Sequence, residues 1–582
     1  MRMSRLIAMT LGVAAMAITL AACGSSNNNS SSSGGGSSSS SSSGGADIAP
    51  TTGKKGGTIN VQSSETFEHL DPGQSYFQVD YVVVYAVDRP LYSFKPDDPS
   101  VAQPDLASGP AQVSADGKTV TVKIRDNVKY SPPVNRTVKA ADVKYAIERG
   151  FSAHVPSGYA SAYFGQIEGV PSAPTNSVPN ISGIETPDDT TIVFHLKSNF
   201  GATLAKALSL PLTVPVPEEY AKSMDAHNPS TYDSDPTKQA FTGPYVISKF
   251  SPSGGVTLTR NPNWDASTDY RPAYADKIVW KTGGDSGVVG RQTLAGTNTL
   301  MADGPPADLI KQAYQNNKDQ IEFTPLGSRY VALNTAKGPL TDLNLRKAII
   351  AVTNKVAMNL VRGGSLIGVP GTHFLTPGQP GFDEAGGDKG FGLDYMNTPT
   401  GNTVLAKSYL KKSGYKGETL TIVGAKEDPA PKSTALLVSS LNSIGIKTKL
   451  IQVPQSTMYS KFCGVPKNSP DICATVGWLP DFPDGYANLY VPFDGKAITA
   501  ANNANWPQLN DPKVNAAIDK ATGEADQSKR NQDWADADKL ISEDAPAVPW
   551  QWSKDAELEG TKIHGVIDLW NSDWNLSFSF LK

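Results

Sequence analysis

The sequence predicts an α/β protein, most clearly between residues 419 and 476. Thr419–Val423, Ile446–Val453 and Asp471–Val476 are apolar, strand-like runs. Ser433–Ile444 and Ser456–Cys463 lie between them and have helical patterns. A strand–helix–strand–helix–strand order implies parallel strands joined by right-handed crossovers.

Elsewhere the same two patterns recur. Strand-like alternation of apolar residues falls mainly in the first half, at Thr58–Val61, Thr119–Ile124, Thr190–Leu196, Tyr245–Phe250, Val256–Arg260 and Lys277–Trp280. Helical spacing is clearer in the second half, at 345–352, 514–521 and 534–541. Asp342 stands where the N-cap of the first of these helices is expected.

Length and composition limit the possible functions. The 582 residues predict two to four domains, and 39% of them are hydrophobic. The 52 basic residues nearly balance the 56 acidic ones, which disfavours nucleic acid or an anionic membrane surface as the main partner. Only the N-terminal segment is apolar enough to meet a bilayer, so a polytopic transporter is excluded. Three cysteines are too few for a disulfide-dense scaffold.

Residues 1–22 are expected to form a signal peptide. Arg2 and Arg5 precede the apolar run Leu6–Leu20, whose 15 residues are short for a membrane span of about 20. The run ends in Leu20-Ala21-Ala22-Cys23, which resembles the bacterial lipobox and predicts cleavage before Cys23 and lipidation of this cysteine. An ordinary secretory signal with an incidental cysteine is the alternative.

The next segment has the composition of a tether. Gly24–Gly45 contains only Gly, Ser and Asn, and such a segment cannot bury apolar surface. Residues 23–53 are therefore expected to connect a lipid anchor to the folded body. The body would work outside the cytoplasm, held at the outer face of the cell membrane by the lipid alone.

The loop directly after Val476 is a candidate binding site. In open parallel sheets, ligands bind beyond the carboxyl ends of the strands. This loop reads Gly477-Trp478-Leu479-Pro480-Asp481-Phe482-Pro483-Asp484-Gly485. Its aromatic, acidic and turn-forming residues suit a loop held rigidly over a cleft.

Several short segments are specific as an ordered set. They are Leu70-Asp71-Pro72, Asp116-Gly117-Lys118-Thr119, Ala140-Ala141-Asp142-Val143, Thr242-Gly243-Pro244-Tyr245, Arg260-Asn261-Pro262-Asn263-Trp264, Leu345-Arg346-Lys347-Ala348-Ile349, Ser413-Gly414-Tyr415, Ile444-Gly445-Ile446, and Trp478 with Asp481. From about Gly56 to the C-terminus, the chain resembles family 5 extracytoplasmic solute-binding proteins of ABC importers. That group includes oligopeptide- and dipeptide-binding proteins.

The resemblance implies a two-lobed, periplasmic-binding-protein-like fold of type II, in the large cluster with an extra subdomain and with a hinge between the lobes. Lobe one would comprise residues 54–327 plus 553–582, with the extra subdomain at about 87–237. Lobe two would comprise residues 328–552. The chain would cross between the lobes near 326–329 and again near 549–554.

The resemblance also implies a function. The protein would be a non-catalytic, substrate-binding lipoprotein that captures extracellular peptides between its lobes. It would deliver them to the permease and ATPase subunits of an importer, as a monomer and without a cofactor. An oligosaccharide or another non-peptide solute, including a metal complex, is the alternative cargo. A cell-surface hydrolase on the same fold is disfavoured, because Gly284-Asp285-Ser286-Gly287 has no histidine base in the expected context and the histidines lack helical zinc spacing.

Asp481 is the central candidate in the site that the resemblance implies. In peptide-binding relatives, the acid at this position pairs with the α-ammonium group of the peptide. A carboxylate in a dry cleft needs such a cation. Alternatively, Asp481 is an N-cap or turn aspartate, which the neighbouring prolines favour. Trp478 would form an apolar wall of the cleft or a core residue, with Gly477 and Leu479 beside it.

Aromatic and polar residues of the first half would complete this site. The candidates are Tyr76, Phe77, Gln78, Tyr159, Tyr163 and Tyr245. The first three lie on a loop whose main chain pairs with extended peptides in relatives, a form of β-augmentation. Tyr245 would line the lobe-one side of the cleft, and Tyr159 and Tyr163 stand where relatives have an aromatic residue at the mouth of the cleft. Tyrosines at the edge of a core have the same appearance in a sequence.

A residue that could bind a ligand carboxylate is harder to find. The predicted strand Asp471–Val476 carries no basic side chain. Arg329, Arg362 and His373 are candidates, each with a surface or hinge position as its alternative.

Cys463 and Cys473 are expected to form a disulfide. They are the cysteines that remain beside Cys23, and the turn-rich residues between them could bring the two ends together. Two buried reduced cysteines are the alternative.

Overall fold

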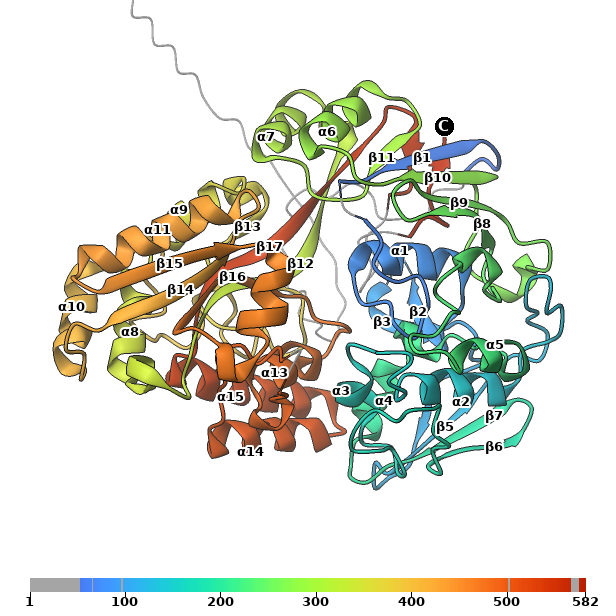
Figure 1. Ribbon diagram of the computed structural model, residues 1–582, viewed down its shortest axis with the longest axis horizontal. Helices are drawn as coiled ribbons and strands as arrows, with labels where there is room; N and C mark the ends of the chain where they lie inside the picture. Colours follow the sequence, from blue (N-terminus) through green and yellow to red (C-terminus); the bar gives the residue numbers. More distant parts are fainter. Residues whose placement is uncertain (1–52, 65, 96–97, 501–502, 567–574) are drawn as a thin grey trace, which may run out of the picture. The chain divides into compact units, whose positions relative to one another are not determined.

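The computed structural model describes residues 53–582 except 65, 96–97, 501–502 and 567–574. The predicted α/β fold is confirmed, with strands and helices alternating over most of this range (Figure 1). The signal peptide, Cys23 and all but the last residue of the expected tether lie outside the described residues. Within the described residues, no helix is both long and apolar enough to cross a membrane.

One mixed sheet of eleven strands runs through the described part of the chain. Its order is β15 (Lys447–Val453), β14 (Thr419–Ala425), β16 (Ile472–Trp478), β12 (Ile321–Leu333), β17 (Ala547–Glu559), β11 (Thr299–Met301), β1 (Thr58–Gln62), β10 (Lys277–Lys281), β9 (Gly255–Arg260) and β8 (Tyr245–Ser251), with β13 (Gly368–Val369) paired on β17. All six strands predicted in the first half are present, with ends that differ by at most one residue. Four of them, β1, β8, β9 and β10, belong to this sheet.

Two strands of 13 residues each, β12 and β17, join the two ends of this sheet. They pair antiparallel with each other from Ile321 opposite Leu558 to Ala332 opposite Ala547. The start of β12 lies beside the part of β17 that pairs with β11, whereas β12 from Ser328 onward also pairs with β16. The change of neighbour coincides with an irregular register near Gly327, whose φ is 146°. A side chain there would collide with the carbonyl oxygen of Trp478, 2.4 Å from the position of a Cβ.

The predicted strand–helix–strand order at 419–476 is confirmed. β14 pairs in parallel with β15 on one side and with β16 on the other, and α11 (Ala430–Ser443) packs against all three strands. The segment predicted as one short helix is α12 (Gln455–Thr457) followed by a π-helical turn at Met458–Cys463. β16 extends two residues further than predicted, because β12 offers Ser328 and Arg329 as partners for Trp478 and Gly477.

Smaller sheets and helices surround this sheet. A four-stranded sheet has the order β4 (Gln112–Val113), β5 (Thr119–Lys123), β7 (Thr191–His195) and β6 (Ile184–Asp188). The two-stranded pairs are β2 (Tyr92–Lys95) with β3 (Asp98–Pro104), and β18 (Ile563–His564) with β19 (Phe580–Leu581).

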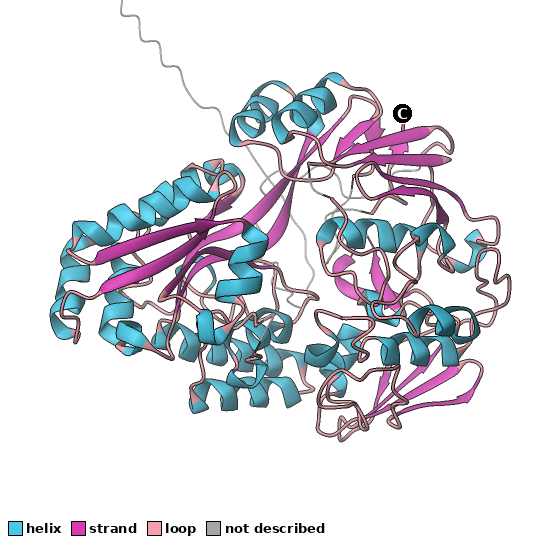
Figure 2. Ribbon diagram, viewed as in Figure 1, coloured by secondary structure: helices cyan, strands magenta, loops and turns pink. Residues whose placement is uncertain are grey.

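Helices flank the strands (Figure 2). Besides α11 and α12, the α-helices are α1 (Gln78–Val87), α2 (Ala140–Arg149), α3 (Ala160–Phe164), α4 (Gly201–Ala207), α5 (Glu218–Asp225), α6 (Ser286–Ala295), α7 (Ala307–Asn316), α8 (Leu343–Val352), α9 (Lys355–Leu360), α10 (Thr403–Lys412), α13 (Gly485–Phe493), α14 (Pro512–Gly523) and α15 (Gln527–Asp544). α8, α14 and α15 are the helices predicted from apolar spacing. Asp342 caps α8 as expected, since its carboxylate accepts hydrogen bonds from the backbone of Asn344 and Leu345.

Candidate functional site

Asp481 lies in the short loop between β16 and α13. β16 is held from both sides by β12 and β14, so the start of this loop is fixed by the sheet. The end of the loop is fixed by Asp484, whose carboxylate caps α13 by accepting a hydrogen bond of 3.0 Å from the backbone of Tyr486. Asp481 itself is only 7% exposed.

Tyrosines from a distant part of the chain surround the carboxylate of Asp481. Tyr163 of α3, 318 positions earlier, donates its hydroxyl to Oδ2 of Asp481. The hydroxyl of Tyr76 lies 3.4 Å from the same oxygen. The ring of Tyr159 packs against both of these tyrosines, with centroid distances of 5.1 Å to Tyr76 and 6.1 Å to Tyr163. The structure therefore brings together four of the predicted site residues.

The carboxyl group of Asp481 has no ionic partner among the described residues. Burial raises its pKa to about 7, and the hydrogen bonds from Tyr163 and Tyr76 lower it by less than burial raises it. Near neutral pH the group is therefore divided between its protonated and ionised forms. Only the ionised form lacks a cation among the described residues, so a positive charge placed beside the carboxylate would favour that form.

Trp478, Gly477 and Leu479 lead into this loop. The indole N–H of Trp478 donates to the carbonyl of Ala487 at 2.7 Å, and its ring packs against Trp506, which holds the side chain in place. Gly477 lies in β16, and a Cβ there would be 3.3 Å from Nη1 of Arg329. Leu479 is half-buried. The one side-chain hydrogen bond among these three residues, that of Trp478, goes to Ala487 and not to Asp481.

The segment that carries Tyr76 is anchored by a buried ionic group. Both carboxylate oxygens of Asp71 accept hydrogen bonds from Arg149, at 2.9 and 2.7 Å. Arg149 also pairs with Asp225 at 2.7 Å, and all three side chains are at most 1% exposed. Burial opposes the ionised form of Asp71, but Arg149 outweighs it and holds the pKa of this carboxyl below its ordinary value. Asp71 thus has a structural part in positioning the loop.

Two other candidates from this segment face different surroundings. Phe77 is the N-cap residue of α1 and is 54% exposed. Gln78, the first residue of α1, is half-buried.

Tyr245 is fully buried in β8, where its hydroxyl donates to the carbonyl of Ala275 at 2.9 Å. The structure places Tyr245 in the core between β8, β10 and α1 and not in the Asp481 cluster.

The candidates for a ligand carboxylate separate into two groups. His373 is fully buried and pairs with Asp538 at 2.7 Å, which makes it a structural residue. Arg329 lies beside Gly477. Burial, together with the charge of Arg329, lowers the pKa of Arg362 to about 9, while Asp555 raises it in part. Arg329, Arg362 and Asp555 therefore lie near one another, beside the paired strands β12 and β17.

Cys463 and Cys473 are joined by a disulfide, with their Cα atoms 6.0 Å apart. The bond connects the π-helical turn Met458–Cys463 to β16. Cys473 lies in the strand that leads to Trp478 and to the loop that carries Asp481.

One group of residues at the site was not predicted from the sequence. Asp484 is fully buried and pairs with Lys206 of α4 at 2.8 Å and with Arg530 of α15 at 2.7 Å. Phe482 and Tyr486 pack against the ring of Tyr163, at 5.1 and 6.1 Å. An aspartate before Gly485 at the start of a helix is a recognisable N-cap pattern, but its two cations come from segments that sequence spacing does not relate to it.

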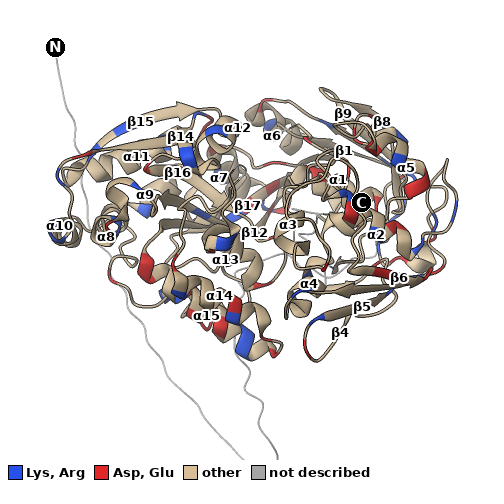
Figure 3. Ribbon diagram, turned by 60° about the horizontal axis from the view of Figure 1, so that its bottom comes forward, with Lys and Arg blue, Asp and Glu red and all other residues tan. Residues whose placement is uncertain are grey.

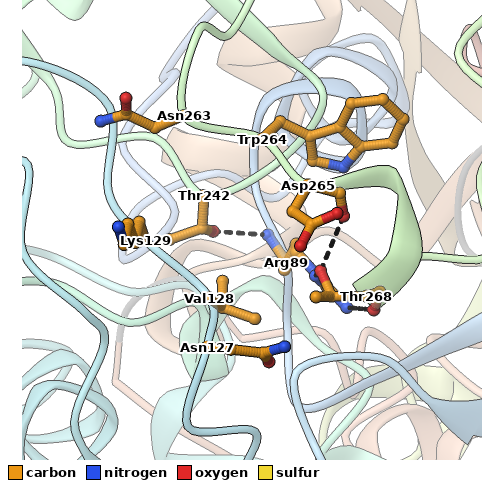
Figure 4. A pocket seen from close by; sticks show the side chains of 9 residues that line it. All are labelled: Arg89, Asn127, Val128, Lys129, Thr242, Asn263, Trp264, Asp265 and Thr268. Carbon is orange, nitrogen blue, oxygen red and sulfur yellow. Dashed lines mark hydrogen bonds between the residues drawn. The ribbon is translucent and has the colours of Figure 1, made fainter.

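A separate shallow pocket, too small to enclose a water molecule, is lined by residues that do not include Asp481 (Figure 4). Arg89 in its wall is already satisfied, since its guanidinium donates to Asp105 at 2.7 Å and to Thr268 at 2.9 Å. The described residues contain no cluster of three or more side chains arranged to hold a metal ion.

Comparison with known proteins identifies the family. Residues 101–500 match the family described as bacterial extracellular solute-binding proteins, family 5, middle part. The chain belongs to this family. The resemblance drawn from the sequence is thereby confirmed. Family 5 proteins work outside the cytoplasm as binding proteins.

Individual family 5 relatives are similar over most of their length. The probable D,D-dipeptide-binding periplasmic protein DdpA of Escherichia coli K12 is 26% identical over 513 residues, which cover 86% of this chain and 90% of that protein. The dipeptide-binding protein DppE of Bacillus subtilis 168 is 24% identical over 532 residues, which cover 90% and 91%. The structure of the periplasmic binding protein DppA from Helicobacter pylori with the peptide STSA has a TM-score of 0.73 at 21% identity, covering 91% and 98%. The fold of this family 5 protein is accordingly the two-lobed one of periplasmic binding proteins.

Proposed function

We propose that this family 5 protein captures peptides with a free amino terminus and delivers them to an ABC importer. The observation that carries the proposal is Asp481, a buried carboxyl group with two tyrosine hydrogen bonds and no cationic partner in the part of the chain that the structure describes. A ligand ammonium would supply the missing charge through a charge-assisted hydrogen bond. The relatives DdpA and DppE are named as dipeptide-binding proteins, which agrees with this ligand chemistry.

The proposed cleft lies between two lobes, with the boundaries at residues 54–327 plus 553–582 and 328–552. The support for this division is that β12 gains β16 as a neighbour after Gly327, and that β17 pairs with β13 at Trp552–Ser553 but with β11 at Leu558–Glu559. Tyr76 and Tyr163 then belong to lobe one and Asp481 to lobe two, so the site is complete only when the lobes are closed. Closure around the ligand follows the hinge behaviour of two-lobed binding proteins.

The proposal includes the cellular setting. Cys23 would carry the lipid that anchors the protein at the outer face of the membrane, with residues 23–53 as the tether. The permease and ATPase subunits of the importer would be the partners of a monomer. The protein would bind its cargo without changing it chemically, as the names of its relatives as binding proteins support.

A second candidate is a non-peptide solute. The concentration of tyrosines around Asp481 would also suit the flat faces of a sugar or another ring-bearing ligand. One relative, the haem-binding protein A of Haemophilus influenzae, is 26% identical over 478 residues, and a related fold was solved with agropinic acid. A non-peptide cargo is therefore the alternative that the experiment must distinguish from a peptide.

Native mass spectrometry of protein purified without refolding tests the proposed function. We expect a set of co-purified peptides, and we expect the Asp481→Asn variant prepared in parallel to lose them. A series of masses with hexose spacing, or a single non-peptide ligand retained by both proteins, would contradict the proposal.

A further inference from the structure

A second buried carboxylate lies three residues beyond Asp481 and is fully ion-paired. Asp484 is 0% exposed. Its Oδ2 accepts hydrogen bonds from Nζ of Lys206 and from Nε of Arg530, both at 2.8 Å, and its Oδ1 accepts one from Nη2 of Arg530 at 2.7 Å. Burial alone would raise the pKa of Asp484, but Arg530 and Lys206 outweigh burial and hold it well below its ordinary value. The carboxylate is therefore ionised whenever all three groups are together.

The three charged residues come from two different parts of the fold. Lys206 lies in α4, which packs against α3 and against β5 of the four-stranded sheet. Asp484 caps α13, and Arg530 lies in α15. Figures 1 and 3 show α4 next to α14 and α15. With the boundaries proposed above, Lys206 belongs to lobe one, and Asp484 and Arg530 belong to lobe two.

Three further hydrogen bonds join the same two surfaces. Nη2 of Arg530 donates to Oγ1 of Thr203 in α4 at 2.8 Å. The amide of Asn199 donates to the carbonyl of Gly523 at the end of α14, at 2.6 Å. Lys206 also reaches Gln527 at 3.3 Å. The contact therefore combines a cluster of polar bonds around one ion pair with an aromatic contact, since the ring of Phe200 beside α4 packs against Tyr486 of α13 at 5.3 Å.

Separating the two surfaces would affect the charged groups unequally. Lys206 would lose Asp484 but would gain water, since its side chain is already 27% exposed. Asp484 would keep both bonds to Arg530, which lies in its own lobe. Opening therefore leaves no buried charge without a partner, which is the costly outcome when an ion pair is broken. Such a contact can open and close reversibly.

We propose that Lys206, Asp484 and Arg530 form an ionic clasp that holds the two lobes closed, with Lys206 as the member that moves away on opening. The inference rests on the proposed function in one respect, namely the two lobes that close around a cleft. Since Asp484 ends the loop that carries Asp481, closing the clasp also brings the Asp481 carboxyl to Tyr163. The clasp stabilises the closed state with or without ligand.

The test measures opening in the ligand-free protein. Spin labels at Asn180→Cys and Lys513→Cys, two exposed positions in the two proposed lobes, report the distance between the lobes. Cys463 and Cys473 do not react with the labels, because they are joined in a disulfide. We expect Lys206→Met to increase the ratio of open to closed molecules about tenfold or more, the effect of losing a hydrogen bond between charged groups. Lys206→Arg should restore most of the closed population.

The matched control is Lys222→Met, which removes the same charge from an exposed pair with Glu218 within α5. It should leave the distances unchanged. Raising the NaCl concentration from about 0.05 M to about 1 M should open the wild-type protein and should have less effect on Lys206→Met, because salt screens the partly exposed pair. This salt titration decides the question if Lys206→Met does not fold.

Equal distances in wild type, Lys206→Met and Lys222→Met would overturn the clasp. So would a wild-type distance that does not respond to salt. All of these measurements are made without ligand, so a failure of peptide binding would contradict the proposed function and leave the result for the clasp standing.

Discussion

The hydroxyl group of Tyr163 donates a hydrogen bond to the carboxylate of Asp481, 318 positions later in the chain. The hydroxyl of Tyr76 lies near the same oxygen, Oδ2 of Asp481. Burial raises the pKa of Asp481 to about 7, the two tyrosine hydrogen bonds offset only part of this rise, and a ligand that carries a positive charge would lower the pKa further. The affinity for an ammonium ligand and the protonation of Asp481 are therefore linked.

Peptide affinity should have an optimum slightly above neutral pH. In the closed site without ligand, Asp481 is mostly protonated below about pH 7 and must release its proton to pair with an ammonium group, so affinity should fall by up to about tenfold per pH unit. Above about pH 8 the α-amino group of the ligand loses its own proton, and affinity should fall again. Calorimetry of a tripeptide between about pH 5 and pH 9 measures both limbs. An affinity that stays constant on the acid side would exclude Asp481 as the titrating group.

Tyr163→Phe should raise the pH below which peptide affinity falls. The variant removes a hydrogen bond that lowers the pKa of Asp481 and leaves the raising effect of burial unchanged. The same calorimetric series measures the midpoint. Tyr245→Phe is the control, because Tyr245 lies in another core and bonds to Ala275, and its midpoint should equal that of the wild type. Equal midpoints for Tyr163→Phe and wild type would show that this hydroxyl does not control the acid.

The local pattern of the chain was sufficient to predict much of the fold. β14, α11 and β15 were predicted because each has its own apolar periodicity, and the loop after β16 was proposed as a site because it follows a buried strand. Within that loop, Asp481 was singled out by the resemblance to family 5 proteins. Tyr245 could not be separated from Tyr163, since a tyrosine in the core beside α1 and one that bonds to Asp481 have the same local sequence signature. The partners of Asp484 could not be predicted, because Lys206 lies 278 positions away and only the folded chain brings the two together.

Arg149→Met should destabilise the protein strongly. The variant leaves Asp71 and Asp225 as buried carboxylates without their cation, which costs about 3–5 kcal/mol. Urea unfolding at neutral pH measures the loss. Lys222→Met, which breaks an exposed pair in the neighbouring α5, should change stability by about 0.5 kcal/mol or less. A loss for Arg149→Met as small as that of Lys222→Met would show that the buried ionic group does not hold the Tyr76 loop.

Replacing Cys463 and Cys473 together by serine should lower both stability and affinity. The bond closes a short loop between residues 10 positions apart, and such a bond contributes roughly 2–3 kcal/mol. Affinity should weaken as well, because the bond braces the strand that leads to Asp481. Thermal unfolding with and without reductant measures the first effect. Reductant should lower the melting temperature of the wild type and leave the double variant unchanged; an equal response of both proteins would contradict this role of the disulfide.

The central claim is that Asp481 binds the ammonium group of the ligand. Calorimetry of one peptide and its N-acetylated form, on the wild type and on Asp481→Asn, tests it most directly. We predict that acetylation weakens binding to the wild type by about 2–5 kcal/mol, the usual cost of breaking a buried charge pair, and has little further effect on Asp481→Asn. Equal affinities of the two peptides for the wild type, or an equal loss on acetylation in both proteins, would contradict the claim.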